Sequence, residues 1–209
     1  MYLDSFLRSQ FGQPSGWIGG LCMGPLLNIA NAHLVNVSIA LLDPRPTDTI
    51  LDIGFGGGNS LVALAAKAPR GRITGVDYSR EMVDHAAGLI AEKGLQARVR
   101  VEWGDVAKLP FRAGTFHKVL SVNSLYYWPD LAGSLRQIAR VPKRGGRCAA
   151  GFRSSASLRP LTHGWEGFWL YEPEEFAGIM SQNGFDIQRV EHRDQWQVLD
   201  TVVVVGKRR

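Results

Sequence analysis

One ten-residue segment combines an acid with closely spaced glycines, a pattern suited to binding a small ligand. The segment is Ile50-Leu51-Asp52-Ile53-Gly54-Phe55-Gly56-Gly57-Gly58-Asn59, in which an apolar run leads into an acid and glycines follow at alternate positions. Glycine adopts positive φ angles and allows close backbone approach without a Cβ clash. We therefore expect this loop to present main-chain amides and carbonyls to a ligand at the carboxyl edge of a sheet.

The acid before the first glycine narrows the class of ligand. A fixed carboxylate repels a pyrophosphate, whereas it attracts a cationic ammonium group. The dinucleotide pattern G-x-G-x-x-G also fails, because its third glycine would fall on Asn59 or, starting from Gly56, on Leu61. The glycines are not followed by the lysine of a P-loop. The loop thus favours a ligand that carries an ammonium group.

Short β-rich runs alternate with helical runs from Thr49 onward, which predicts a parallel sheet wrapped by helices. The expected strands are 49–53, 72–76, 97–103, 118–122, 147–152, 185–191 and 197–205. The expected helices are 26–42, 60–67, 80–93, 131–141 and one that begins at 173. Ser79 and Gly94 are the predicted N-cap and stop of the helix over 80–93. Asp52 lies at the end of the first expected strand, and Asp77 and Asp105 follow the second and third. Acids therefore occur at the ends of three successive strands.

The sequence D-x-G-x-G-x-G after an apolar strand is the signature of class I S-adenosylmethionine-dependent methyltransferases, and the chain resembles that family from about Thr49 to Gly206. The resemblance implies an α/β fold, a Rossmann-like seven-stranded, mostly parallel sheet with helices on both faces and an antiparallel last strand. It implies S-adenosyl-L-methionine as the cofactor, S-adenosyl-L-homocysteine as its product, and no metal. We expect residues 1–46 to form an N-terminal helical cap and residues 47–209 the methyltransferase domain.

The resemblance also assigns the cofactor-binding residues. The two carboxylate oxygens of Asp77 would accept the ribose hydroxyls, and Tyr78 would lie against the adenine. Asp105 would accept the adenine amino hydrogens while the next backbone amide faces a ring nitrogen. The full expected set is Asp52, Gly54, Gly56, Gly58, Asp77, Tyr78, Met82, Gly104, Asp105, Val106 and Asn123.

Aromatic residues near the same edge predict a pocket for a small, aromatic or apolar methyl acceptor. Aromatic faces can surround a methylsulfonium without competing as nucleophiles. The first wall follows the fourth strand, the second belongs to the uncharged N-terminal segment, and the third follows the fifth strand. The predicted acceptor-binding residues are Trp17, Met23, Tyr126, Tyr127, Trp128, Arg153 and Trp165.

An oxygen acceptor often needs a general base, and His163 is the first candidate. It lies in a loop after the fifth strand, and imidazole titrates near working pH. His33 on the N-terminal helix is a weaker alternative, whereas His117 begins a strand at the opposite edge. Carbon or nitrogen acceptors can react without a base, so the acceptor atom stays open among O, N and C.

Composition sets the broad class. The chain has 209 residues, a net charge of +5, 45% apolar and 21% charged residues, which excludes disordered and fibrous proteins. Two cysteines cannot build a disulfide framework, so a reducing, cytoplasmic setting is expected. Residues 9–42 contain no Asp, Glu, Lys or Arg. Glycines and Pro25 interrupt this segment, which argues against a membrane span or signal peptide. We expect this segment to pack on the domain or on a second subunit, as in a homodimer.

Two alternatives remain beside the small-molecule enzyme. The basic residues Arg140, Lys143, Arg144 and Arg147 suggest a nucleic-acid methyltransferase acting on RNA, but they belong to the edge away from the predicted site. If the last strand is antiparallel, residues 207–209 reach that same edge. The sequence therefore disfavours nucleic acid. The other alternative is a non-catalytic S-adenosylmethionine-binding protein, because a binding site alone does not prove turnover.

The chain departs from the family pattern at two places. His117-Lys118 stands where relatives usually have an acid after the aromatic residue that begins strand four. Pro142 precedes Lys143 in the turn before strand five, whereas relatives place a proline after the lysine. Both departures lie away from the predicted cofactor residues.

Overall fold

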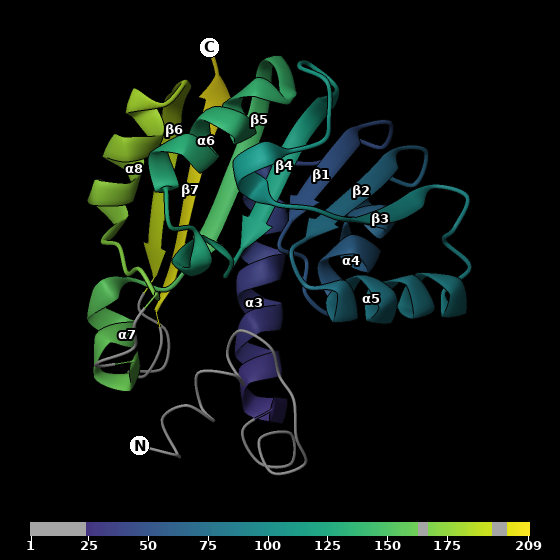
Figure 1. Ribbon diagram of the computed structural model, residues 1–209, viewed down its shortest axis with the longest axis horizontal. Coiled ribbons are helices and arrows are strands. Elements are labelled where there is room, and N and C mark those ends of the chain that lie inside the picture. Colours follow the sequence, from purple (N-terminus) through teal and green to yellow (C-terminus); the bar gives the residue numbers. More distant parts are fainter. Residues whose placement is uncertain (1–23, 163–166, 194–199) are drawn as a thin grey trace.

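The computed structural model describes residues 24–162, 167–193 and 200–209, and within these ranges seven strands form one mixed sheet (Figure 1). The strand order is β3-β2-β1-β4-β5-β7-β6, with β1 to β5 parallel and β7 antiparallel to both neighbours. The elements are α3 (Gly24–Leu42), β1 (Thr49–Ile53), α4 (Asn59–Lys67), β2 (Arg72–Asp77), α5 (Arg80–Glu92), β3 (Val99–Trp103), η1 (Val106–Lys108), β4 (Phe116–Val122), η2 (Leu125–Tyr127), α6 (Leu131–Arg140), β5 (Pro142–Phe152), α7 (Ser155–Thr162), α8 (Pro173–Gln182), β6 (Phe185–Arg193) and β7 (Thr201–Arg208). The predicted fold class is confirmed.

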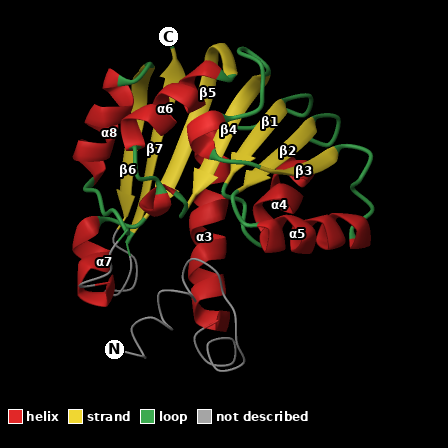
Figure 2. Ribbon diagram, viewed as in Figure 1, coloured by secondary structure: helices red, strands yellow, loops and turns green. Residues whose placement is uncertain are grey.

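Helices cover both faces of the sheet (Figure 2). Alternating side chains on the central strands build a core on each face. On β1, Ile50 packs in the core covered by α3, α4 and α5, while its neighbour Leu51 packs in the core covered by α6 and α8. Leu120 and Val119 divide in the same way on β4. Burial on both faces explains why these strands are nearly continuous apolar runs.

Helix α3 crosses one face of the sheet over β4, β5 and β7. Leu34 and Leu42 are fully buried against the strands. Gly151 on β5 permits this approach, because a Cβ there would come within 2.2 Å of the Ser38 hydroxyl. The N-terminal end of α3 projects beyond the carboxyl edge of the parallel strands (Figure 1). Within the described residues, no helix has the length and apolar character that a membrane crossing requires.

Local signals end the helices where the sequence predicts. The Ser79 hydroxyl accepts the Met82 amide at the start of α5, and Gly94 follows that helix at φ 66°. The strands β4 and β5 begin earlier than expected, at Phe116 and Pro142. The pairing moves from Phe116 with Pro142 directly to Lys118 with Arg147, so β5 carries extra residues there. This bulge is why the apolar pattern alone places the start of β5 too late.

Gly75 on β2 provides a test of the packing beneath the glycine loop. A Cβ at Gly75 would lie 2.5 Å from the Phe55 ring and 3.0 Å from a Leu61 methyl. We expect Gly75→Ala to lower the free energy of unfolding by about 1–3 kcal/mol because the core is overpacked. Urea denaturation measures this change.

Gly88→Ala is the matched control, because Gly88 lies in α5 and no atom in the described part of the chain lies within 4 Å of the position that an added Cβ would take. It should raise stability by about 0.5–1 kcal/mol through helix propensity. Equal effects of the two substitutions would contradict the packing role of Gly75.

Candidate functional site

The glycine loop leaves β1 at the carboxyl edge in left-handed backbone conformations. Gly54, Gly56 and Gly58 have φ angles of 71°, 54° and 87°. A Cβ at Gly54 would lie 2.4 Å from the Ser124 Cβ, and one at Gly58 would lie 2.9 Å from the Ala86 Cβ. Gly56 differs, because no atom of the described residues lies within 4 Å of the position that its Cβ would take. The loop is therefore packed at both ends and open in its middle.

Asp77 at the end of β2 ties this loop to the next strand. Its Oδ2 accepts the Gly56 amide at 2.9 Å, and its Oδ1 accepts the Ser79 amide at 2.9 Å. Each carboxylate oxygen can accept more than one hydrogen bond, so Asp77 retains the capacity to accept ligand hydroxyls. The half-buried carboxylate thus positions the open part of the loop and faces the same edge.

Asp52 is a buried acid directly before the loop. The pKa of its carboxyl is raised from 3.8 to about 7, mainly by burial; a hydrogen bond from Ser60 opposes the rise and the Asp77 charge adds to it. Among the described residues, no group donates a hydrogen bond to its Oδ2, which is buried. A buried carboxylate without a partner is costly, so a cationic ligand group beside it would be stabilised.

The third acid stands at the end of β3. Asp105 is exposed, and its Oδ1 accepts the Ala107 amide at 2.8 Å, which begins η1. On the adjacent strand end, Tyr78 is 71% exposed. The Trp103 indole donates to the Tyr78 carbonyl at 2.9 Å, and the Arg80 guanidinium lies 4.2 Å from the centroid of the Trp103 ring. These contacts hold the backbone of Tyr78 while its ring stays available.

Asn123 joins the end of β4 to helix α3. It has a φ of 54°, which is uncommon for a residue other than glycine and is often found at functional sites. Its Nδ2 donates to the Asn31 Oδ1 at 2.9 Å, and its Oδ1 accepts the Tyr126 hydroxyl at 3.3 Å. Sequence patterns did not identify Asn31, because this contact joins residues 92 positions apart.

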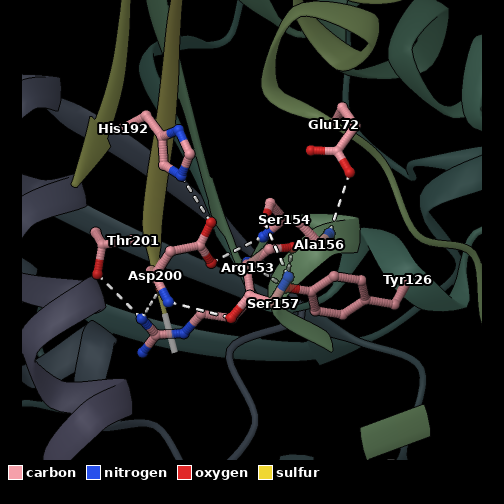
Figure 3. A network of polar contacts seen from close by, with 9 residues as sticks. All are labelled: Tyr126, Arg153, Ser154, Ala156, Ser157, Glu172, His192, Asp200 and Thr201. Carbon is pink, nitrogen blue, oxygen red and sulfur yellow. Dashed lines mark hydrogen bonds and ion pairs between the residues drawn. The ribbon is translucent and has the colours of Figure 1, made fainter. Parts of the chain in front are cut away.

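A polar network extends from Tyr126 past the end of β5 to the start of β7 (Figure 3). The Tyr126 hydroxyl accepts the Arg153 amide, and the Arg153 guanidinium donates to the Asp200 carbonyl and to the Thr201 hydroxyl. The Asp200 carboxylate accepts the Ser154 amide at 3.0 Å and pairs with His192 at 2.8 Å. Burial raises the pKa of Tyr126. This phenol is therefore neutral and acts as a hydrogen-bonding group.

The Arg153 guanidinium is directed into this network. We predicted an acceptor-binding role for Arg153, and the side chain is 5% exposed. The Arg153 guanidinium is hydrogen-bonded to the Asp200 carbonyl and the Thr201 hydroxyl, so it links the end of β5 to the start of β7.

The predicted aromatic wall after β4 divides into a buried part and an exposed part. Tyr126 and Trp128 are buried in the core, whereas Tyr127 is 41% exposed. Phe168 stacks on Tyr126 with ring centroids 4.9 Å apart and meets Tyr127 edge-on at 5.3 Å. The Trp169 amide donates to the Tyr126 carbonyl at 2.9 Å. The segment after α7 thus returns to η2, where Phe168 joins the predicted aromatic wall.

Four predicted residues lie outside the described part of the chain. They are the candidate base His163 and the acceptor-binding residues Trp17, Met23 and Trp165. Of the histidines weighed as bases, His33 has a buried Nε2 for which the described residues provide no hydrogen-bond partner. His117 is the second residue of β4 and lies at the edge opposite the glycine loop. No group of acids, histidines and cysteines that could hold a metal occurs within the described residues.

Comparison with known proteins identifies the family. A family model described as "Methyltransferase domain" matches residues 50–146. YdaC, an uncharacterized methyltransferase of Bacillus subtilis (strain 168), is 33% identical over 126 residues, which is 60% of this chain and 67% of YdaC. The chain belongs to the methyltransferase family.

Two further relatives have names that state a methyl acceptor. The 27-O-demethylrifamycin SV methyltransferase of Amycolatopsis mediterranei (strain S699) is 33% identical over 125 residues, 60% of this chain and 46% of that protein. The demethylmenaquinone methyltransferase of Lactobacillus johnsonii is 30% identical over 153 residues, 72% of this chain and 62% of that protein. The chain therefore spans less than two thirds of the length of these two relatives.

A solved structure agrees on the fold. The YcgJ protein from Bacillus subtilis superposes with a TM-score of 0.73 at 20% sequence identity, covering 85% of this chain and 99% of that one. At this identity the similarity establishes the shared architecture.

The network of Figure 3 predicts unequal roles for two adjacent tyrosines. Tyr126→Phe removes the hydroxyl that accepts the buried Arg153 amide, so we expect the free energy of unfolding to fall by about 1–3 kcal/mol. Tyr127→Phe is the control, because the Tyr127 hydroxyl forms no hydrogen bond within the described chain, and it should change stability by less than about 0.5 kcal/mol. Equal values in urea denaturation would contradict the structural role of the Tyr126 hydroxyl.

Proposed function

We propose that this protein transfers the methyl group of S-adenosyl-L-methionine to an O, N or C atom of a small aromatic or apolar molecule. The observation that carries the proposal is that Asp52 and the glycine loop lie together at the carboxyl edge of β1. There Asp52, whose buried Oδ2 has no hydrogen-bond partner among the described residues, precedes a loop in which no described atom lies close to the middle glycine. Family membership supports the same reaction.

The residues present fit this cofactor. Its ammonium group matches the unpartnered Asp52 Oδ2, and its ribose matches the remaining acceptor capacity of Asp77. The exposed Tyr78 ring and the Asp105 carboxylate can face an adenine. When bound, the cofactor supplies an electrophilic methyl group on a sulfonium. The remaining members of the predicted set, Met82, Gly104 and Val106, are proposed as backbone or packing contacts.

The protein itself contributes to the reaction by orienting the methyl donor and the acceptor and by enclosing them. Methyl transfer is an in-line displacement, so holding donor and acceptor in contact outside water provides much of the rate enhancement. Asn123 and Tyr127 stand at the end of β4, where an acceptor would meet the donor. We propose His163 as the base for an oxygen acceptor, with His33 as the alternative. The names of the rifamycin and menaquinone relatives support a small-molecule acceptor, and we propose a cytoplasmic enzyme.

The proposed role of Asp77 predicts a loss of cofactor affinity. Asp77→Ala removes the acceptor of the Gly56 amide and the proposed acceptor of the ribose hydroxyls. S-adenosylhomocysteine binding, measured by calorimetry, should weaken by about 1.5–3 kcal/mol, which is roughly 10- to 150-fold. Asp186→Ala, an exposed acid on β6 at the opposite edge, is the control and should bind as the wild type does. Unchanged affinity in the Asp77 variant would remove it from the cofactor site.

The raised pKa of Asp52 predicts a pH dependence with a defined sign. The free protein holds this carboxyl largely protonated below pH 7, and only the carboxylate attracts an ammonium group. Affinity for S-adenosylhomocysteine should therefore rise with pH, by up to about tenfold per unit below the pKa, and level off above it. Asp52→Asn should flatten this dependence, since its side chain does not titrate. A slope that persists in the Asn variant would assign the proton to another group.

Turnover decides among the three functional alternatives. The protein is incubated with S-adenosylmethionine and a panel of phenols, quinones, amines and RNA, and release of S-adenosylhomocysteine is followed. The proposal predicts turnover on a small molecule. Turnover on RNA alone would favour the nucleic-acid alternative, and binding of the cofactor without turnover on any acceptor would favour a non-catalytic protein. If a phenol is accepted, His163→Ala should lower the rate about 100-fold or more.

A further inference from the structure

A cavity of about 400 Å³ lies at the amino-terminal edge of the sheet, opposite the glycine loop. Its residues come from the loop after α3, the start of β4, the start of β5, β6 and the end of β7 (Figure 1). They are Asp43, Arg45, Asp48, His117, Lys118, Lys143, Arg144, Gly145, Gly146, Arg147, Gln188 and Lys207. We call this cavity the basic pocket. Lys118 and Asn123 are five residues apart at β4, so roughly 16 Å separates the pocket from the carboxyl edge.

The charges in the basic pocket do not balance. Its two acids are already engaged, since Asp43 pairs with Arg147 at 3.3 Å and Asp48 pairs with Lys118 at 3.7 Å. Lys118 also donates to the carbonyls of Leu42 and Asp43, so it is fully used in holding the end of α3. Within the described chain, four cationic side chains lack an acidic partner. These are Arg45, Lys143, Arg144 and Lys207.

The fold brings these cations together at a local cost. Arg147 on β5 lies directly opposite Lys207 on β7, and like charges in such a cross-strand pair repel. The bulge between Pro142 and Arg147 places Lys143 and Arg144 in the lining of the same basic pocket. Gly145 turns the chain there with a φ of 73°. A bound anion would offset this repulsion, which solvent alone only screens.

The contact between Lys143 and His117 points the same way. The Thr49 amide donates to the His117 Nδ1 at 3.0 Å, which fixes the imidazole at the start of β4. The His117 Nε2 lies 2.8 Å from the Lys143 Nζ, so the imidazole holds this ammonium group at the pocket. An anionic oxygen in the pocket would accept a hydrogen bond from Lys143.

We propose that the basic pocket is a second binding site, separate from the methyl-transfer site, for a small molecule that carries at least two linked phosphate groups. Guanidinium groups bind phosphate oxygens in pairs, and the pocket contains several guanidinium and ammonium groups spread over its walls. The cavity volume falls in the range of small-molecule sites rather than of an open nucleic-acid surface. Both departures from the family pattern, at His117-Lys118 and at Pro142-Lys143, lie in or beside this pocket.

The test uses inorganic pyrophosphate as the probe, titrated calorimetrically into the full chain at about 0.15 M salt. Saturable binding is expected, and the double substitution Arg144→Ala/Lys207→Ala should weaken it about tenfold or more. The matched control is Arg70→Ala/Arg72→Ala, which removes two exposed cations from the same edge outside the pocket and lowers the net charge equally. This control should retain wild-type affinity.

Three results would overturn the proposal. The first is the absence of saturable pyrophosphate binding. The second is an equal loss in both double variants, which would indicate a diffuse electrostatic effect. The third is binding of a single-stranded RNA oligonucleotide that pyrophosphate does not displace and that both double variants weaken equally. S-adenosylhomocysteine is titrated in parallel, and its affinity should be the same in the Arg144/Lys207 variant and in the wild type. A failure of the second site is thereby distinguished from a failure of the methyl-transfer site.

Discussion

The carboxyl edge of the sheet depends on the Asp77 carboxylate, which binds two backbone amides from different turns. One amide belongs to Gly56 in the loop after β1, and the other belongs to Ser79 at the start of α5. A loop of glycines has a high conformational entropy in the unfolded chain, so it needs such a fixed acceptor to adopt one shape. The same oxygens keep the capacity to bind a ligand. The side chain that orders the loop is thus also the proposed ligand acceptor.

The burial of Asp52 has a cost that the fold offsets elsewhere. A carboxyl without a hydrogen-bond donor at Oδ2 opposes folding when it is ionised, and the raised pKa reflects that penalty. The two apolar cores on either face of the sheet supply the compensating stability. A binding site of this kind is consistent with local strain being retained where function requires it.

The sequence predicts the features that depend on neighbouring residues. The seven strands, the glycine loop and the three acids near successive strand ends follow from short-range patterns, and the structure contains them, although β4 and β5 begin earlier than the patterns place them. Features that depend on distant contacts were not predictable. The sequence predicts Arg153 as an acceptor-binding residue, and only the fold shows that its guanidinium donates to the carbonyl of Asp200, 47 residues further along the chain. Asn31 contacts Asn123, and Phe168 contacts Tyr126 and Tyr127, only because the folded chain packs α3 and the segment after α7 beside the end of β4.

Strand β4 holds helix α3 at two points. Lys118 near the start of the strand binds the carbonyls of Leu42 and Asp43, and Asn123 just past its end binds Asn31. The helix therefore cannot slide along its axis unless both attachments break together. A displacement of the helix at one end of the strand would therefore be transmitted to the other end, so α3 couples the two edges of the sheet.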